Sequence, residues 1–176
     1  MNSYCVFCKT GSELSVAEKI NIIDKSVNAI APTRVIQEKR GGIWVKKHKI
    51  LLPGYVFLFS NEDLETGLIR NLTDLYKVLS YDRGIRTLIG KDRDYAMWIW
   101  KYHGSIDTSK VLKEGRRVKV IEGPLLDCHG VIKKLDKHKR KVWVEFEFDG
   151  MARTIVLSAE CVDPSDTKGE PEGTNE

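Results

Sequence analysis

The sequence lacks the features that would place it in a membrane, outside the cell or among common enzymes. No stretch of its 176 residues approaches the roughly 18 consecutive apolar residues of a membrane-spanning helix. The N-terminus has neither the basic start nor the apolar core of a secretory signal peptide. We find no glycine-rich phosphate loop after a strand, no nucleophile elbow and no H-E-x-x-H motif. We therefore expect a cytoplasmic protein with no membrane partner, no catalytic residues and no cofactor.

Cysteine is scarce, with four residues in the chain. Cys5 and Cys8 have the C-x-x-C spacing of zinc and dithiol sites, but the residues around them favour a β-strand. Side chains three apart in a strand point to opposite faces, so these thiols are not expected to bind one metal. The four histidines show no pairing with carboxylates in the sequence. We predict reduced, buried or half-buried cysteines, as in a cytosolic protein, and no metal site.

Neither sign of charge is in large excess: 29 basic and 25 acidic side chains give a net charge of +4. This balance permits a nucleic-acid partner without requiring one. The last thirteen residues, 164–176, carry one lysine against four acids and have no apolar side chain apart from prolines. They are predicted to form a disordered acidic tail. The remaining composition, with 41% apolar residues overall, is that of a globular protein.

The first hundred residues alternate strand-like and helix-like segments. Apolar residues spaced by four, three and four predict an amphipathic helix, and an almost wholly apolar run predicts a central strand. The expected strands cover residues 4–9, 28–32, 33–37, 43–47, 55–59 and 77–81, and the expected helices cover 12–26, a segment starting at 60–63, and 95–102. The last helix has an aromatic stripe. We interpret it as core packing, with a ligand surface as the alternative.

The second part of the chain changes to short strands. Residues 104–110 are small and polar, as in a linker. Strands are predicted at 117–121, 130–135, 141–148 and 151–157, with a hairpin turn at Asp149-Gly150. The predicted fold class is α+β: an N-terminal antiparallel sheet flanked by helices, followed by a small all-β SH3-like barrel. The predicted boundaries are 1–104, a linker at 105–112, the barrel at 113–163 and the tail at 164–176.

Residues 115–132 resemble the KOW motif. In this segment Val118 and Val120 are expected to point inward, Gly123-Pro124 to reverse the chain, and Gly130 to let the next strand approach closely. KOW modules occur in ribosomal proteins as well as in transcription factors. The motif alone therefore leaves a ribosome-associated RNA-binding protein open as one interpretation.

The first part of the chain favours transcription. The segment Leu51-Leu52-Pro53-Gly54-Tyr55-Val56-Phe57, after a basic hairpin, resembles the N-terminal domain of the NusG family. With the KOW motif, this resemblance extends to about residue 163. It implies a monomeric factor that binds RNA polymerase at the clamp helices of the largest catalytic subunit and suppresses pausing without doing chemistry. The implied polymerase-binding residues are Tyr4, Phe7, Leu51, Leu52, Pro53, Gly54 and Tyr55. The alternative is that these side chains only fill the base of the sheet.

Two clusters of basic residues are candidate nucleic-acid sites. The first flanks the hairpin and, by the resemblance, faces upstream or non-template DNA; it contains Lys9, Lys39, Arg40, Lys46, Lys47 and Lys49. The alternative is a solvated hairpin protected from edge pairing. The second belongs to the predicted barrel and favours RNA, including an RNA hairpin. It contains Arg116, Arg117, Lys119, Lys133, Lys134, Lys137, His138, Lys139, Arg140, Lys141 and Arg153. Here the alternative is a solvated face.

The excess of barrel cations makes the chain most similar to specialised paralogs of the LoaP and RfaH types, which act on selected operons. Two departures weaken details of this resemblance. Leu125 stands where the family often has Phe, and Glu65-Thr66-Gly67 stands where the RfaH type has a second polymerase contact. The leading hypothesis is processive antitermination with recognition of RNA. A general elongation factor is the main alternative.

Overall fold

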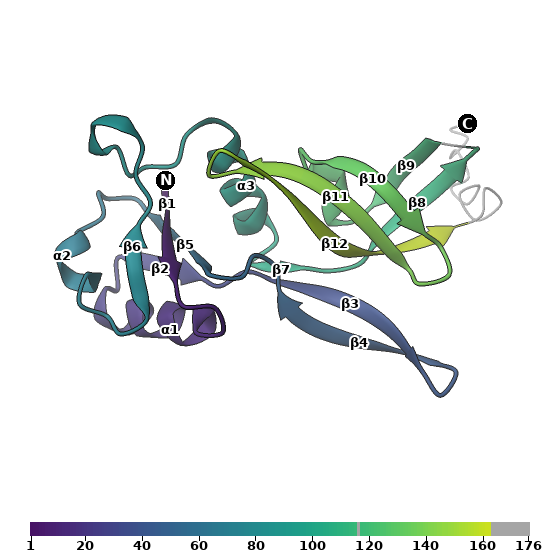
Figure 1. Ribbon diagram of the computed structural model, residues 1–176, viewed down its shortest axis with the longest axis horizontal. Coiled ribbons are helices and arrows are strands. Elements are labelled where there is room, and N and C mark those ends of the chain that lie inside the picture. Colours follow the sequence, from purple (N-terminus) through teal and green to yellow (C-terminus); the bar gives the residue numbers. More distant parts are fainter. Residues whose placement is uncertain (116, 163–176) are drawn as a thin grey trace, which may run out of the picture.

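The computed structural model describes residues 1–115 and 117–162, which form three β-sheets with α-helices around them (Figure 1). The fold is mixed α+β and rich in sheet, as the sequence predicts. Within the described residues, no helix has the length and apolarity needed to cross a membrane. The acidic tail predicted at 164–176 lies outside the described residues.

An antiparallel sheet of four strands forms the N-terminal part. Its order is β2 (Val27–Ile30), β5 (Tyr55–Ser60), β1 (Asn2–Cys8) and β6 (Leu75–Val78). All six residues of β5 are buried, which confirms the prediction of a central strand. Helix α1 (Glu13–Ile23) packs on one face of this sheet through Val16 and Ile20.

The prediction of a helix that starts at residues 60–63 is wrong. Ser60 still belongs to β5, where it pairs with Asn2 and Val27 and is therefore held extended. The chain forms only the one-turn helix α2 (Thr66–Ile69), followed after β6 by the 3-10 helix η1 (Asp82–Gly84). Strand pairing on both sides thus prevails over a local helix-start pattern.

A long hairpin makes the second sheet. Strands β3 (Thr33–Arg40) and β4 (Ile43–Ile50) turn at Gly41-Gly42, and the short β7 (Ser105–Ile106) pairs with β3 in parallel. Helix α3 (Gly90–Lys101) precedes β7. The segment predicted as a linker is therefore structured, since it contains β7 and the beginning of β8 at Ser109.

The C-terminal sheet has five strands. Its order is β10 (Val131–Asp136), β11 (Lys141–Phe148), β12 (Met151–Val162), β8 (Ser109–Glu114) and β9 (Arg117–Glu122), with β12 and β8 parallel and the other pairs antiparallel. The 3-10 helix η2 (Pro124–Asp127) connects β9 to β10. As predicted, alternate residues of β11 are buried, namely Val142, Val144, Phe146 and Phe148.

Gly130, just before β10, confirms the close approach that the motif predicts. A Cβ atom at this position would lie 2.5 Å from Val144 Cγ1 and 3.0 Å from the carbonyl oxygen of Glu145. Any side chain here would push β10 away from β11, so the absence of a Cβ permits this packing.

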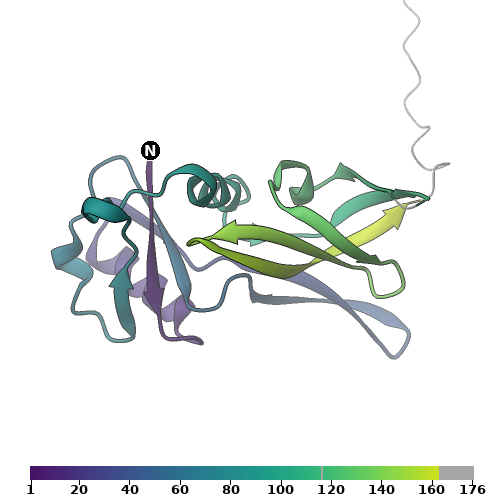
Figure 2. The same cartoon turned by 45° about the horizontal axis from the view of Figure 1, so that its top comes forward.

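The N-terminal and C-terminal sheets pack against each other with α3 between them (Figures 1 and 2). One continuous apolar cluster runs from Phe57 of β5 through Tyr95 of α3 to Phe146 and Phe148 of β11. A second, separate cluster lies under α1. The two faces of the N-terminal sheet are thus covered in different ways.

Candidate functional site

The segment around Leu51 contributes to an apolar face of the N-terminal sheet, on the side opposite α1. We call the surface formed by Phe7, Leu51, Leu52 and Tyr55 the Leu51 face. Leu51, Leu52 and Tyr55 are 1%, 4% and 6% exposed, and the rings of Phe7 and Tyr55 lie 5.4 Å apart. Pro53 is exposed beside them. Most of the predicted polymerase-binding residues therefore gather in one place.

Gly54 and Glu13 fix the turn that leads into Tyr55. Gly54 has φ +84°, and a Cβ atom there would lie 3.0 Å from the ring of Phe7. The buried carboxylate of Glu13 accepts hydrogen bonds from Gly54 N at 2.7 Å and from Gly11 N at 2.9 Å. Because Glu13 begins α1, these bonds connect the helix start to the Leu-Pro-Gly turn.

Tyr4 does not join the Leu51 face. Its side chain is buried in the cluster under α1, and its hydroxyl accepts a hydrogen bond from Leu64 N at 3.3 Å. Tyr4 and Phe7 are three residues apart in β1, so they point to opposite faces of the sheet. The strand periodicity in the sequence was sufficient to separate these two residues.

The C-terminal sheet covers the Leu51 face. The ring of Phe148 lies 5.6 Å from that of Tyr55 and 5.3 Å from that of Phe57. Arg153 donates from Nη2 to the Tyr55 hydroxyl at 2.7 Å, and its guanidinium lies over the Tyr55 ring. Burial raises the pKa of Tyr55, while the nearby Arg153 opposes this shift. In this closed arrangement, Tyr55 is not accessible to a large partner.

Helix α3 extends the contact between the N-terminal part and the C-terminal sheet. Tyr95 stacks on Phe146 with ring centres 4.3 Å apart, and Trp98 Nε1 donates to the Pro124 carbonyl oxygen at 2.8 Å. The interpretation of the aromatic stripe as core packing is confirmed for these two side chains. Periodicity along one helix does not say which segment completes the core, so the partnership with β11 was missed.

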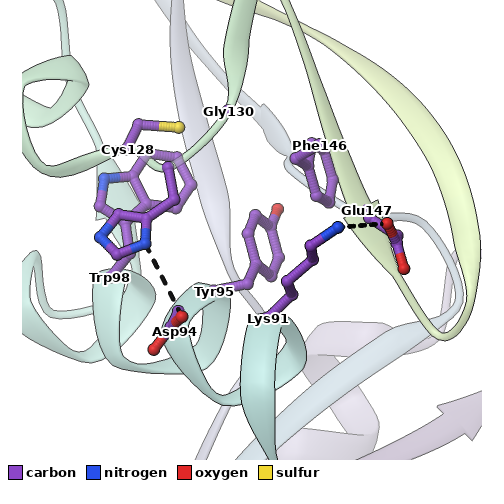
Figure 3. Close-up of a pocket in the computed structure, with 9 residues that line it drawn as sticks. Lys91, Asp94, Tyr95, Trp98, Cys128, Gly130, Phe146 and Glu147 are labelled. Atoms are coloured by element: carbon purple, nitrogen blue, oxygen red, sulfur yellow. Dashed lines mark hydrogen bonds and ion pairs between the residues drawn. The ribbon is translucent and has the colours of Figure 1, made fainter.

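A pocket of about 210 Å³ opens where α3 meets the C-terminal sheet (Figure 3). Tyr95, Trp98 and Phe146 line it together with Cys128. Two side-chain contacts cross its rim: Lys91 Nζ forms an ion pair with Glu147 Oε2 at 2.6 Å, and His129 Nδ1 lies 3.7 Å from Asp94 Oδ2. The second contact could not be seen in the sequence, because Asp94 lies 35 residues before His129 and becomes its neighbour only through folding.

The cysteines are free thiols, as predicted. Cys5 belongs to the cluster on the Leu51 side and Cys8 to the cluster under α1, which confirms that they face opposite ways. Burial raises the pKa of Cys5 well above its usual value and raises that of Cys8 to about 11. Across the described residues, no group of three or more His, Cys, Asp or Glu side chains is placed to hold a metal ion.

The hairpin distributes its cations over two faces. Arg40, Lys47 and Lys49 surround Glu38 on one face. Hydrogen bonds from Lys49 and then Lys47 lower the pKa of Glu38 to about 2. The other face carries Lys39, the half-buried Trp44, and Lys46, which forms an ion pair with Asp107 at 3.2 Å.

Lys9 does not belong to the hairpin cluster. It directly follows β1, whereas the hairpin extends away from the sheet that contains β1 (Figure 1). The six residues of the predicted DNA site are therefore distributed over separate surfaces.

The cations of the predicted RNA site also differ in their surroundings. Arg117 and Lys119 are exposed on β9, while Arg116 lies outside the described residues. On β10 and β11, Lys133 pairs with Glu145 at 2.9 Å, and Lys134 lies over the ring of Trp143. We call residues 137–140, between β10 and β11, the basic turn. Its Lys137, His138 and Lys139 are exposed, and Lys141 is half-buried at the start of β11.

Two arginines of the predicted RNA site contact the N-terminal part instead of standing free. Arg153 binds Tyr55, as described above, and Arg140 donates from Nη1 to Gln37 Oε1 of the hairpin at 2.7 Å. The Arg140 guanidinium also lies 4.4 Å from the centre of the Trp44 ring. Sequence reasoning missed Gln37 and Trp44, although a tryptophan among lysines in a hairpin is a visible signal.

Comparisons with known proteins agree with this architecture. The family model described as "Transcription termination factor nusG" matches residues 1–93. The chain is 27% identical over 143 residues to the transcription termination/antitermination protein NusG of Escherichia coli (strain K12), covering 78% of this chain and 77% of that protein. It is 28% identical over 134 residues to the protein of the same name from Salmonella typhi, covering 73% and 72%.

A solved structure described as "Domain interaction in Thermotoga maritima NusG" is also similar. Its TM-score is 0.54 at 25% sequence identity, and the match covers 89% of this chain and 93% of that chain. The match thus includes both the N-terminal and the C-terminal sheets.

Proposed function

The chain belongs to the NusG family, and from this premise we propose that it is a cytoplasmic transcription factor that binds elongating RNA polymerase, suppresses pausing and termination, and recognises RNA. Its relatives carry the name transcription termination/antitermination protein. Residues 1–104 form the polymerase-binding domain, and residues 113–163 form an SH3-like KOW domain. The inward-facing valines and phenylalanines of β11 and the close approach at Gly130 support the second assignment.

The Leu51 face is the polymerase-binding surface. The observation that supports it most is that this face is apolar, whereas the contacts by which the C-terminal sheet covers it are partly polar. Arg153 donates a hydrogen bond to the Tyr55 hydroxyl, and further polar contacts surround the aromatic side chains of the interface, including the ion pair between Lys91 and Glu147. Such mixed interfaces between domains separate more readily than a purely apolar core. The KOW domain therefore leaves this face before the clamp helices bind it.

A double substitution tests this assignment. Leu52→Glu with Tyr55→Ala should abolish binding to purified clamp helices, because it removes an apolar contact and introduces a charge. The same substitution weakens closure, so any loss of binding is not due to a more tightly covered face. Circular dichroism provides the control for folding. Unchanged affinity in a folded variant would exclude the Leu51 face as the polymerase site.

RNA recognition belongs to the KOW domain and begins at the basic turn. Lys137 and Lys139 are exposed there, and neither forms an ion pair with a carboxylate among the described residues. Their replacement by Ala should weaken binding of a hairpin RNA and lower the slope of log K against log salt by roughly 0.7–0.9 per lost contact. Polymerase binding should be unchanged. An unaltered salt slope would exclude the basic turn as the RNA site.

The hairpin is the candidate DNA-binding element, since it projects from the fold and its two strands carry four lysines of the predicted DNA site. Upstream or non-template DNA is the proposed ligand. The cations that surround Glu38 are already partly neutralised. Lys39 lies on the other hairpin face and has no such partner among the described residues, so it is the hairpin cation most available to a phosphate, whether of DNA or of RNA.

Specialised action of the LoaP or RfaH type is the favoured form of this function, because the KOW domain has many cations beside its buried core. A general elongation factor is the second candidate, and the names of the similar proteins favour it. Genome-wide occupancy of polymerase separates these alternatives. A specialised paralog occupies polymerase on a few long operons, whereas a general factor occupies it on most transcribed genes.

A further inference from the structure

The hairpin and the basic turn, which are about 95 residues apart in the sequence, meet in the folded chain. The turn between β10 and β11 lies beside the hairpin in both views (Figures 1 and 2). Arg140 makes the connection, since its guanidinium contacts Gln37 and Trp44 of the hairpin. Two clusters that sequence reasoning assigned to different nucleic acids therefore adjoin each other.

Arg140 is held in a defined position. Its Nη1 donates to Gln37 Oε1 at 2.7 Å and to Glu160 Oε1 at 2.9 Å, and Trp44 lies against the guanidinium plane. A guanidinium has five N–H donors, and in the described residues only Nη1 of Arg140 makes hydrogen bonds. The side chain is 33% exposed. A pre-oriented arginine thus retains donors for an acceptor that approaches from solvent.

The lysines on either side of Arg140 form no side-chain ion pairs among the described residues; the nearby acids are Asp136, which accepts a hydrogen bond from Lys139 N at 2.9 Å, and Glu160, which pairs with Arg140. Lys39 pairs with Trp44 across the hairpin and shares its face, while Lys137 and Lys139 belong to the basic turn. All three are exposed, and none forms an ion pair with a carboxylate among the described residues. By contrast, the cations on the opposite hairpin face surround Glu38. Free positive charge therefore concentrates where the two segments meet.

We propose that Lys39, Trp44, Lys137, Lys139 and Arg140 form a single RNA-binding surface, which is complete only while the two domains are closed. This proposal rests on the proposed recognition of RNA and names where it takes place. The ligand must present phosphates to lysines on both sides of Arg140, which the two backbones of a folded RNA stem do. Trp44 packs against the Arg140 guanidinium and fixes its orientation. Counterion release from the stem supplies affinity.

The proposal has a consequence for polymerase binding. Because RNA binds a surface that only the closed arrangement completes, RNA stabilises closure and opposes binding to free clamp helices. On the transcribing enzyme, a nascent RNA stem would hold the factor nearby at high local concentration. The KOW lysines then retain part of the RNA contact when the domains separate.

Charge reversal on each side of the junction tests the proposal in the full-length chain. The probes are a fluorescent stem-loop RNA, a DNA stem-loop of the same sequence and a single-stranded RNA of the same composition. Lys39→Glu and Lys137→Glu should each weaken stem-loop RNA binding about fivefold or more, and each should lower the salt slope by roughly 0.7–0.9. Lys25→Glu, which reverses the charge of an exposed lysine in the turn after α1, is the matched control and should leave both quantities unchanged.

The outcomes separate the junction from the broader function. If Lys137→Glu weakens binding while Lys39→Glu behaves like Lys25→Glu, the joint surface is refuted and RNA recognition by the basic turn stands. If neither substitution weakens binding, both proposals fail. Equal affinity for the DNA stem-loop or the single-stranded RNA would refute a folded RNA stem as the ligand.

Two further measurements address Trp44 and the coupling. Trp44→Ala should weaken RNA binding, and Trp44→Phe should restore most of it, because a ring again supports Arg140. Stem-loop RNA should raise the apparent Kd for purified clamp helices. If RNA instead lowers this Kd, it binds the open arrangement better, and the joint surface is refuted. Equal RNA affinity for Trp44→Ala and the unaltered chain would remove Trp44 from the surface.

Discussion

The two faces of the N-terminal sheet are both buried, but they are buried by different kinds of segment. One face packs on α1, which begins five residues after β1 and buries Val16 and Ile20. The Leu51 face packs on α3 and on β11, whose Phe148 is about 100 residues from Leu51 in the chain. The first core is therefore completed within the N-terminal part itself, whereas the second is completed by another domain.

The surroundings of the two cores differ accordingly. The cluster under α1 consists of apolar and aromatic side chains that all come from elements of the N-terminal part. The contact over the Leu51 face includes Arg153 on Tyr55 and, at its edges, Lys91 with Glu147 and Lys101 with Asp127. Exposed ion pairs contribute little to stability, so an interface bordered by them is suited to reversible separation. Burial of a residue thus does not by itself distinguish permanent core from a covered binding surface.

Phe148→Ala should have the largest effect on the covered face. Phe148 is fully buried against the rings of Tyr55, Phe57 and Tyr95, and its truncation should weaken closure by about 3–5 kcal/mol. In NMR relaxation the two domains should tumble separately, and affinity for clamp helices should rise. Loss of the N-terminal sheet in this variant would contradict the comparison, because it would make Phe148 part of a permanent core.

Ile20→Ala should act on the opposite face with a different outcome. Ile20 belongs to α1, where its side chain is fully buried against the sheet and makes no contact with the other domain's cluster. Its truncation should reduce the free energy of unfolding by about 2–5 kcal/mol. Denaturant titration followed by circular dichroism measures this loss. The domains should remain closed in the fraction that is folded. Separate tumbling of intact domains would show that the two faces are not independent.

Arg153→Ala should have a smaller effect on closure. It removes the charged hydrogen bond to Tyr55, at about 1–2 kcal/mol because Arg153 is half-buried. Clamp-helix affinity should increase less than in Phe148→Ala, since the aromatic contact remains. The matched variant Tyr55→Phe removes the same hydrogen bond from the other side. An increase in separate tumbling for only one of the two variants would mean that this bond does not hold the domains together.

The smallest effect should come from pH. Burial, and then the hydrogen bond to Asp127, raise the pKa of Tyr102 to about 12. An unfolded tyrosine ionises near pH 10, so the contribution of this group is fully present below about pH 10 and is lost as pH rises to about 12. The stability difference between the unaltered chain and Tyr102→Phe should therefore shrink over this range. A constant difference from pH 9 to 12 would remove the Tyr102 contact from the closed interface.

The sequence by itself determined the elements whose pattern is local. Strand β5 is recognisable because every residue except Ser60 is apolar or aromatic, and α1 and α3 because their apolar residues recur at helical spacing. Alternation along β11 identified its buried side chains, and the separation of Cys5 from Cys8 followed from strand periodicity. The segment at Leu51 was recognised because its Pro-Gly turn and following strand are consecutive in the chain.

Only the tertiary structure decided which surfaces meet. That Arg153 binds Tyr55, that Arg140 lies on Trp44, and that His129 adjoins Asp94 depends on segments 35 to about 100 residues apart. Sequence periodicity gives the direction of a side chain within its own element, but it carries no information about the element that packs opposite. Charge patterns have the same limit, because a run of lysines looks alike whether it is solvated, paired with Glu38 or placed beside a second basic segment. The buried and exposed faces were therefore predictable, whereas their partners depended on long-range packing.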